Sequence, residues 1–240
     1  MSNTSLQTAT AQIKVLSAGA IKTGLAKLAR AFEEETGHRV VIGFATAPVI
    51  RGRVDNEEAG ADVVIVPVPT MKDFEKKGRI VSGSSAVVGK VRAAVVIRDG
   101  AAEPDISTAE ALKKEILASR SLVYNEASSG LYIEKLMDHL GIAEEVKAKK
   151  TRVPTADAVM RHLAESKVEN EIGFGQVPAI LVYKDQGVKL VGALPKEIEN
   201  VTTYSAAVLA GARPLELARK FIQFLTAQSA KKVFVATGVE

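Results

Sequence analysis

The chain alternates short runs of apolar and β-branched residues with longer segments in which apolar residues recur every three or four positions. The short runs are typical of strands, and the longer spacing is typical of amphipathic helices. Over the first 80 residues the pattern predicts strands at 13–17, 39–44 and 62–66. We expect one helix that ends at Gly37 and another that opens at Pro48, where a missing N–H costs nothing. The apolar face of the first helix would consist of Ile21, Leu25, Leu28, Ala29 and Phe32.

The rest of the chain continues this alternation. Strands are predicted at 91–97, 121–124, 151–153, 171–174, 188–191 and 202–210. Helices are predicted at 107–118, 131–140, 155–166, 214–226 and 229–236. Ser107 and Glu110 have the spacing of a capping box, so we expect Ser107 to open its helix.

The run 62–66 is almost continuously apolar, which is typical of a strand in a parallel sheet covered on both faces. Strands that alternate with helices predict an α/β fold, here with two doubly wound α/β lobes. No linker rich in Gly, Ser or Pro interrupts the pattern. We therefore expect strands, rather than a flexible tether, to join the lobes.

Composition narrows the chemistry. The 240 residues include no cysteine, which excludes disulfides and thiolate sites, and the three histidines His38, His139 and His162 lack the spacing of a zinc site. We expect no metal and no cofactor. The net charge of +4 comes from interspersed basic and acidic residues, which argues against a nucleic-acid partner. No stretch approaches the ~20 apolar residues that a membrane span needs.

The first 11 residues are small and polar, and we expect them to form a disordered tail. They contain neither the charged nor the apolar region of a signal peptide. Ala-Thr-Ala at 9–11 nevertheless resembles the stretch around a signal cleavage site. We therefore expect a periplasmic protein whose leader has been removed, with a cytoplasmic location as the alternative.

Four loops combine small residues with the start of a predicted helix. Small residues let the backbone approach a ligand, and the N–H groups at a helix start favour an anion. Two such loops in each lobe would form an anion clamp, whereas the alternative is that each loop is only a good helix cap. The loops are Ala18-Gly-Ala20 with Lys22, Ala45-Thr-Ala-Pro48 with Arg51, Asn125-Glu-Ala-Ser-Ser-Gly130, and Thr155-Ala-Asp157.

Short motifs in a fixed order extend over residues 12–240. They are Leu-Ser-Ala-Gly-Ala-Ile-Lys at 16–22, Phe-Ala-Thr-Ala-Pro at 44–48, Ala-Asp-Val-Val-Ile at 61–65, Ser-Ser-Gly-Leu-Tyr at 128–132, Ile-Gly-Phe-Gly-Gln at 172–176 and Phe-Leu-Thr-Ala-Gln-Ser-Ala at 224–230. Together they resemble the molybdate-binding-protein-like branch of the periplasmic solute-binding proteins. The resemblance implies a type II architecture with two crossing strands, lobe I at 12–85 and 205–240 and lobe II at 86–204. It also implies that the ligand binds between the lobes.

The chain departs from this branch where molybdate would bind. Members that hold molybdate use serine hydroxyls and a tyrosine, and the matching positions here are Ala20, Ala47 and Gln176. A tetrahedral oxyanion would lose these donors. Cations are instead expected near the site at Lys22, Arg51 and Arg92, and guanidinium groups pair well with carboxylates. The sequence thus favours a small polycarboxylate as the ligand. The alternative is that these cations bind nothing: Arg51 would share a solvated helix face with Arg53, and Lys22 and Arg92 would be ordinary surface residues.

The resemblance includes a catalytic offshoot, the aconitate isomerases, which shift a proton across an allylic system without a cofactor. Lys22 and Glu126, which lie in two of the loops named above, are the candidate bases for such a shift. The resemblance implies an isomerase that converts trans-aconitate to cis-aconitate. The alternative is the solute-binding component of an ABC importer, with its permease as partner, for a carboxylate or for molybdate or a related oxyanion. We expect His162, Tyr124 and Tyr204 to have core or hinge roles. The other expected binding residues are Gly19, Ala20, Thr46, Ala47, Ser128, Ser129, Asp157, Gln176 and, at the lobe crossover, Tyr204.

Overall fold

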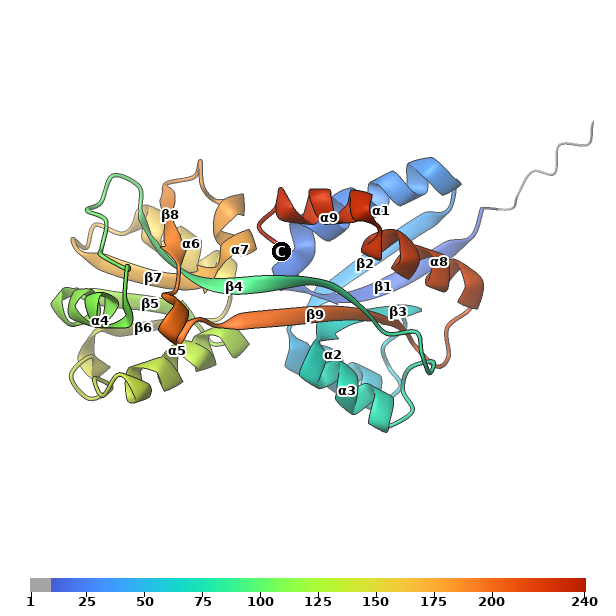
Figure 1. Cartoon of the computed structure of the whole chain (residues 1–240), viewed down its shortest axis with the longest axis horizontal. Helices are drawn as coiled ribbons and strands as arrows, with labels where there is room; N and C mark the ends of the chain where they lie inside the picture. The colour runs from blue at the N-terminus through green and yellow to red at the C-terminus, as the bar shows by residue number, and fades with distance from the viewer. Residues whose placement is uncertain (1–9) are drawn as a thin grey trace, which may run out of the picture. The chain divides into compact units, whose positions relative to one another are not determined.

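The computed structural model describes residues 10–240, and its helices and strands are shown in Figure 1. The chain divides into two compact units. Unit 1 comprises Met1–Val88 and Tyr204–Val233, and unit 2 comprises Gly89–Thr203 and Phe234–Glu240. The predicted division assigns all of 205–240 to lobe I, whereas the structure assigns Phe234–Glu240 to unit 2. The reason is that Glu240 pairs with the backbone of Lys90, in unit 2.

Unit 1 is built on a sheet whose strands β1, β2 and β3 are parallel, in the order β2-β1-β3, with β9 antiparallel at the side of β3. These strands are β1 (Gln12–Ala18), β2 (Arg39–Ala45), β3 (Val63–Pro67) and β9 (Val201–Val208), of which β9 belongs to unit 1 from Tyr204 onwards. Its helices are η1 (Gly19–Ile21), α1 (Lys22–Thr36), α2 (Ala47–Asp55), α3 (Val68–Lys76) and α8 (Leu215–Thr226), and α9 (Gln228–Val235) follows at the boundary.

The core of unit 1 confirms the predicted apolar patterns. Strand β3 is buried from Val63 to Val66, as its continuous apolar run predicts. On α1, the expected face is buried, and Phe32 makes edge-to-face contacts with Phe221 and Phe224 of α8 at 5.1 and 5.4 Å between ring centroids. Gly37 ends α1 with a left-handed φ of 71°, which glycine adopts without strain.

Unit 2 contains a mixed sheet. Strand β7 pairs in parallel with β5 and antiparallel with β4, β5 pairs in parallel with β6, and β8 pairs antiparallel with β4. These strands are β4 (Ala86–Arg98), β5 (Ser121–Asn125), β6 (Lys150–Val153), β7 (Glu171–Gln176) and β8 (Val188–Ala193). The helices are α4 (Ala109–Ala118), α5 (Ser128–His139), η2 (Lys147–Lys149), α6 (Ala156–Glu165), α7 (Val177–Val182) and η3 (Lys196–Ile198).

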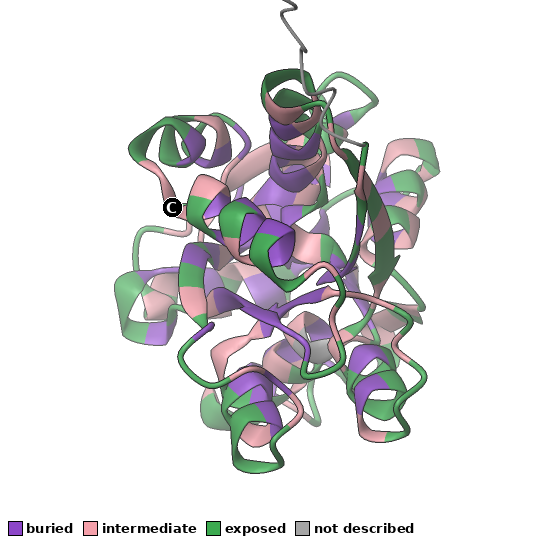
Figure 2. Cartoon of the chain, turned by 90° about the vertical axis from the view of Figure 1, so that its right-hand side faces the viewer, coloured by how far each residue is buried: buried purple, intermediate pink, exposed green. Residues whose placement is uncertain are grey.

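Two apolar clusters cover the two faces of this sheet, as a doubly wound lobe requires. One contains Leu122 and Tyr124 of β5 together with α4 and α5, and the other contains Val123 of β5 together with α6. Successive residues of a strand point to opposite faces, which explains this division. Figure 2 colours the chain by burial and shows helices that are buried on one side and exposed on the other.

Three local predictions need correction. Thr108, not Ser107, caps α4, because its Oγ1 accepts the N–H of Ala111 at 3.1 Å. Helix α5 begins at Ser128, three residues before the predicted start at 131. Helices α3 and α7 were not predicted at all, because each starts directly after a strand with apolar residues that extend the strand's own pattern.

Residues 1–9 of the predicted disordered tail lie outside the described residues. Ala11 is fixed in place, since its N–H donates to Nδ1 of His38 at 3.2 Å and its carbonyl accepts the N–H of Arg39 at 2.9 Å. Within residues 10–240, no helix has the length and hydropathy that a membrane crossing requires.

Candidate functional site

The carboxyl ends of the parallel strands carry the predicted loops in unit 1. Strands β1, β2 and β3 run in the same direction, so their carboxyl ends meet at one edge, and each leads directly into a helix. Ligands of open α/β sheets bind at such edges. Gly19 and Ala20 form η1 after β1, and Thr46 and Ala47 begin α2 after β2. The start of α3 at Val68, which was not predicted, is the third helix start at this edge.

Lys22 is the first residue of α1 and is exposed. Its Nζ lies 5.9 Å from the ring centroid of Phe44, near the end of the neighbouring strand β2. This is cation–π distance, and it holds the ammonium group beside the loop that contains Thr46 and Ala47. Lys22 therefore lies at the edge where the sequence predicts it to bind or act on an anion.

Arg51 has partners within unit 1. Its Nη2 lies 3.2 Å from Oδ2 of Asp73 and donates to Oγ1 of Thr70 at 3.3 Å, both on α3. Roughly half of each charged side chain remains exposed, at 46% for Arg51 and 44% for Asp73. The guanidinium is thus held near the start of α3 by an exposed ion pair, and its predicted role in ligand binding requires an exchange of partners.

Unit 2 repeats this arrangement at the carboxyl ends of β5, β6 and β7, which lead into α5, α6 and α7. Asn125, which is buried, organises the first of these turns. Its Oδ1 accepts the N–H of Ala127 at 2.8 Å, and its Nδ2 donates to Oγ of Ser129 at 3.0 Å. The N–H of Glu126 donates to the carbonyl of Val153 at 2.9 Å, which ties the loop to the end of β6.

Gly130 lets α5 start this close to the strand. A Cβ at this position would lie 1.5 Å from the carbonyl oxygen of Asn125 and 2.6 Å from its carbonyl carbon. Such distances are far inside van der Waals contact, so only glycine fits. The Ser-Ser-Gly motif therefore has a packing function at its third residue.

The remaining predicted residues of unit 2 are distributed over these turns. Glu126 and Asp157 are exposed, and the side chain of Ser128 lies outside the described residues. Thr155 caps α6, because its Oγ1 accepts the N–H of Ala158 at 3.1 Å. Gln176 is the half-buried N-cap of α7, and its side chain makes no capping hydrogen bond within the described part of the chain.

Arg92 lies at the same edge of unit 2. The next residue, Ala93, pairs with Gln176 across β4 and β7. The Nε of Arg92 donates to Oε1 of Glu240 at 2.8 Å, and its Nη1 donates to Oε2 of Glu199. The bond to Glu240 raises the pKa of Arg92, and the same bond lowers the pKa of the Glu240 carboxyl. The two carboxylates were not predicted, since both are distant from Arg92 in the sequence.

A polar cluster forms where Glu134 of α5 meets Tyr124 of β5 and Lys150 of β6. The buried Tyr124 donates its hydroxyl to Oε1 of Glu134 at 2.5 Å, and Nζ of Lys150 lies 3.0 Å from Oε2 of the same carboxylate. Burial raises the pKa of Tyr124, and the bond to Glu134 raises it further. Burial alone would raise the pKa of Glu134, but the bonds from Tyr124 and Lys150 outweigh it and lower the pKa. The cluster joins α5 to β5 and β6.

Tyr204, His162 and His139 lie on three different elements. Tyr204 is buried on β9, where it pairs with Pro67 at the carboxyl end of β3. The side chain of His162 is 35% exposed, so the expected core position is only partly correct, and its Nε2 lies 3.1 Å from Oε1 of the buried Glu171. His139 is exposed at the end of α5.

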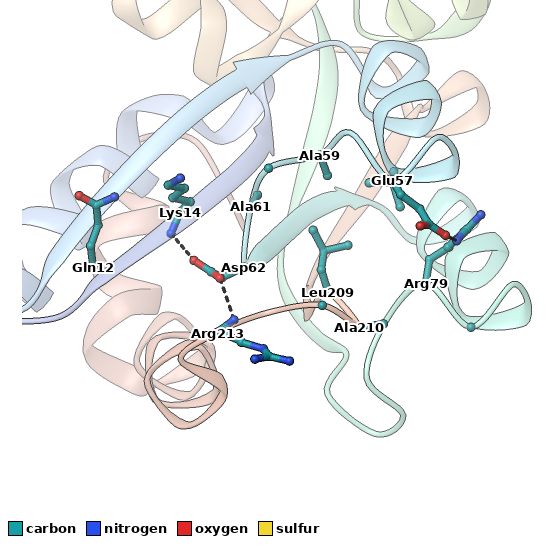
Figure 3. A pocket seen from close by; sticks show the side chains of 14 residues that line it. Gln12, Lys14, Glu57, Ala59, Ala61, Asp62, Arg79, Leu209, Ala210 and Arg213 are labelled. Carbon is teal, nitrogen blue, oxygen red and sulfur yellow. Dashed lines mark hydrogen bonds and ion pairs between the residues drawn. The ribbon is translucent and has the colours of Figure 1, made fainter.

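A hollow of about 740 Å³ lies at the opposite edge of the unit 1 sheet, at the amino ends of β1 and β3 (Figure 3). Asp62 accepts the N–H of Lys14 at 2.8 Å and that of Arg213 at 3.1 Å, and Glu57 pairs with Arg79 at another wall. None of the predicted site residues lines this hollow. Among residues 10–240, no group of three or more histidine and carboxylate side chains is placed to hold a metal ion.

Two comparisons with known sequences give matches over nearly the whole chain. The model of a family described as bacterial extracellular solute-binding proteins matches residues 13–240. An aconitate isomerase from a Pseudomonas species is 27% identical over 234 residues, which cover 95% of this chain and 87% of that protein.

Solved structures show the same fold. The periplasmic molybdate-binding protein of Azotobacter vinelandii has a TM-score of 0.76 at 18% identity, with 95% of this chain and 98% of that chain covered. The sulfate-binding protein SubI of Mycobacterium tuberculosis has a TM-score of 0.73 at 16% identity, with 95% and 86% covered. The expected periplasmic-binding-protein fold is thereby confirmed.

Proposed function

The chain belongs to the bacterial extracellular solute-binding protein family, and from this premise we propose that it binds a small polycarboxylate and interconverts trans- and cis-aconitate. The observation that carries this proposal is the likeness to an aconitate isomerase over 95% of the chain. The proposed binding groups are the helix starts and cations at the carboxyl edges of the two units. A periplasmic location is part of the proposal, and the extracellular solute-binding family supports it.

The residues at these edges support a carboxylate ligand. Ala20 and Ala47 offer no hydroxyl to an oxyanion, whereas Lys22, Arg51 and Arg92 offer charged donors. In the structure, Arg51 and Arg92 already bind carboxylates, those of Asp73, Glu199 and Glu240. Exposed ion pairs of this kind contribute little net free energy, so a ligand carboxylate can replace a protein one.

The proposed reaction is an allylic proton shift. A base removes a proton from the methylene carbon next to one carboxylate, the double bond moves by one carbon, and the proton is returned to the far end of the allylic system. Glu126 and Lys22 are the candidate bases, because both are exposed at the carboxyl edge of their unit. Helix-start N–H groups and guanidinium groups would stabilise the negative charge of the dienolate. No atom is gained or lost, so no co-reactant is required.

The test of turnover is direct. Incubation with trans-aconitate in deuterated water should move the vinylic proton signals to those of cis-aconitate and should incorporate deuterium at the exchanging carbon. Glu126→Gln and Lys22→Met should separate the two candidate bases, since the catalytic one is needed for exchange. Absence of both isomerisation and deuterium uptake at micromolar protein would refute the isomerase proposal.

The test of the ligand site uses two arginines of one helix. Arg51→Ala should weaken polycarboxylate binding by about 1.5–3 kcal/mol, because it removes charge-assisted hydrogen bonds. Arg53→Ala, two residues further along α2 and also exposed, is the matched control and should leave binding unchanged. Calorimetric titration with trans-aconitate measures both. If Arg51→Ala and the parent bind trans-aconitate with equal affinity, Arg51 is not part of the ligand site.

A second candidate function is delivery of an anion to an ABC importer. It is favoured because the similar solved structures include molybdate- and sulfate-binding proteins. A thermal-shift panel of citrate, trans-aconitate, tricarballylate, molybdate and sulfate ranks the ligands, since a compound that binds only the folded protein raises its melting temperature. Tight binding without turnover would favour this function, with a permease as the partner.

A further inference from the structure

Arg92 is placed to meet a ligand at the carboxyl edge of unit 2. It precedes Ala93, which pairs with Gln176, the N-cap of α7. Its side chain is 35% exposed, so the guanidinium reaches solvent at this edge. Arg92 therefore has the position of a ligand-binding residue, yet two protein carboxylates already contact it.

The position of Glu240 is set by its backbone. Its N–H donates to the carbonyl of Lys90 at 2.8 Å, and its main-chain oxygen accepts the N–H of Lys90 at 2.6 Å. The preceding residue, Val239, is 1% exposed and packs beside Gly89, where a Cβ would lie 2.5 Å from its Cγ1. Strand β4 thus holds Glu240 at Arg92 independently of the ion pair.

The ion pair itself is exposed. The side chain of Glu240 is 55% accessible and that of Glu199 is 37% accessible, so water and salt screen both contacts with Arg92. The Glu240 carboxylate can therefore leave the guanidinium at small cost while its backbone stays in place. It remains close enough to return, which gives it a high effective concentration at Arg92.

We propose that Glu240 is an intramolecular competitor that occupies the Arg92 guanidinium until a ligand carboxylate displaces it, and that it thereby sets the affinity of this edge for the ligand. This inference rests on the proposed function, because it assumes a carboxylate ligand at this edge. Ligand and Glu240 compete for the same donors. The competition lowers the affinity of every ligand that uses Arg92 by the same factor, because each ligand must displace the Glu240 carboxylate.

Glu240→Gln tests the competition. The amide keeps the shape of the side chain and the backbone hydrogen bonds to Lys90, but it removes the negative charge of the side chain. We expect trans-aconitate and tricarballylate to bind about 2- to 5-fold more tightly to this variant, measured by calorimetric titration. Glu103→Gln is the matched control, because it breaks an exposed ion pair to Lys189 in the same unit. It should leave the affinity unchanged.

A double-mutant cycle shows whether the effect acts through Arg92. In an Arg92→Ala background, Glu240→Gln should no longer change the affinity. Suppose that the parent protein binds trans-aconitate and that Glu240→Gln binds it no more tightly. That result would overturn the inference and leave the proposed function intact. If the parent binds none of the polycarboxylates, the proposed function and the inference both fail.

Discussion

Replacement of Gly130 by alanine should destabilise the protein, although alanine is the better helix former. The new Cβ would lie 1.5 Å from the carbonyl oxygen of Asn125, and its nearest neighbours are all backbone atoms, which cannot rotate away as a side chain can. Overpacking of this kind costs up to about 3 kcal/mol, and the helix propensity of alanine returns about 1 kcal/mol. The expected net loss is therefore about 2 kcal/mol, with a displaced start of α5 and weaker polycarboxylate binding.

Gly52→Ala is the matched control, because Gly52 lies inside α2 and a Cβ there would have no heavy atom of another described segment within 4 Å. This variant should be stabilised by about 0.5–1 kcal/mol, since alanine loses less backbone entropy on folding. Urea unfolding followed by circular dichroism measures both. If Gly130→Ala unfolds at the same urea concentration as the parent, or if Gly52→Ala loses as much stability as Gly130→Ala, the packing argument is refuted.

Three further predictions concern the polar contacts of unit 2. Thr108→Ala should lower the free energy of unfolding by about 1 kcal/mol, because the α4 cap is lost. Ser107→Ala should change it by less than ~0.5 kcal/mol. Thermal melts that rank the two variants in the reverse order would contradict the observed cap. Tyr124→Phe should lower the free energy of unfolding, measured in urea, by about 1–2 kcal/mol, because the Tyr124 hydroxyl donates to Glu134. An unchanged urea midpoint would show that this hydrogen bond does not stabilise the protein. Because the folded pKa of Glu134 lies below its usual 4.5, its contribution to stability is complete above that pH and is lost as the pH falls through the lowered pKa. Glu134→Gln should remove this part of the acid dependence, and acid unfolding curves of identical shape for parent and variant would contradict it.

The sequence predicted much of the candidate site because helix starts are local features. The loops at Gly19, Thr46 and Thr155 were found from small and capping residues beside an amphipathic pattern, and each lies at the carboxyl end of a parallel strand. The partners of the cations could not be found in this way. Arg92 meets residues 107 and 148 positions away, and no local pattern encodes that contact.

The same distinction holds for Asn125 and Gly130. The sequence pattern places both in a helix-start loop, but the dense packing between them depends on how α5 returns over the end of β5. A signal was present in the sequence, since glycine three residues into a helix is unfavourable unless something requires it.

The sequence by itself determined the order of the strands, the helices other than α3 and α7, the apolar faces and the α/β class, because hydrophobic periodicity and end signals act over a few neighbouring residues. Tertiary structure decided which charges meet. It joined Arg51 to Asp73 and Arg92 to Glu199 and Glu240, since contacts between side chains distant in sequence exist only once the strands have paired.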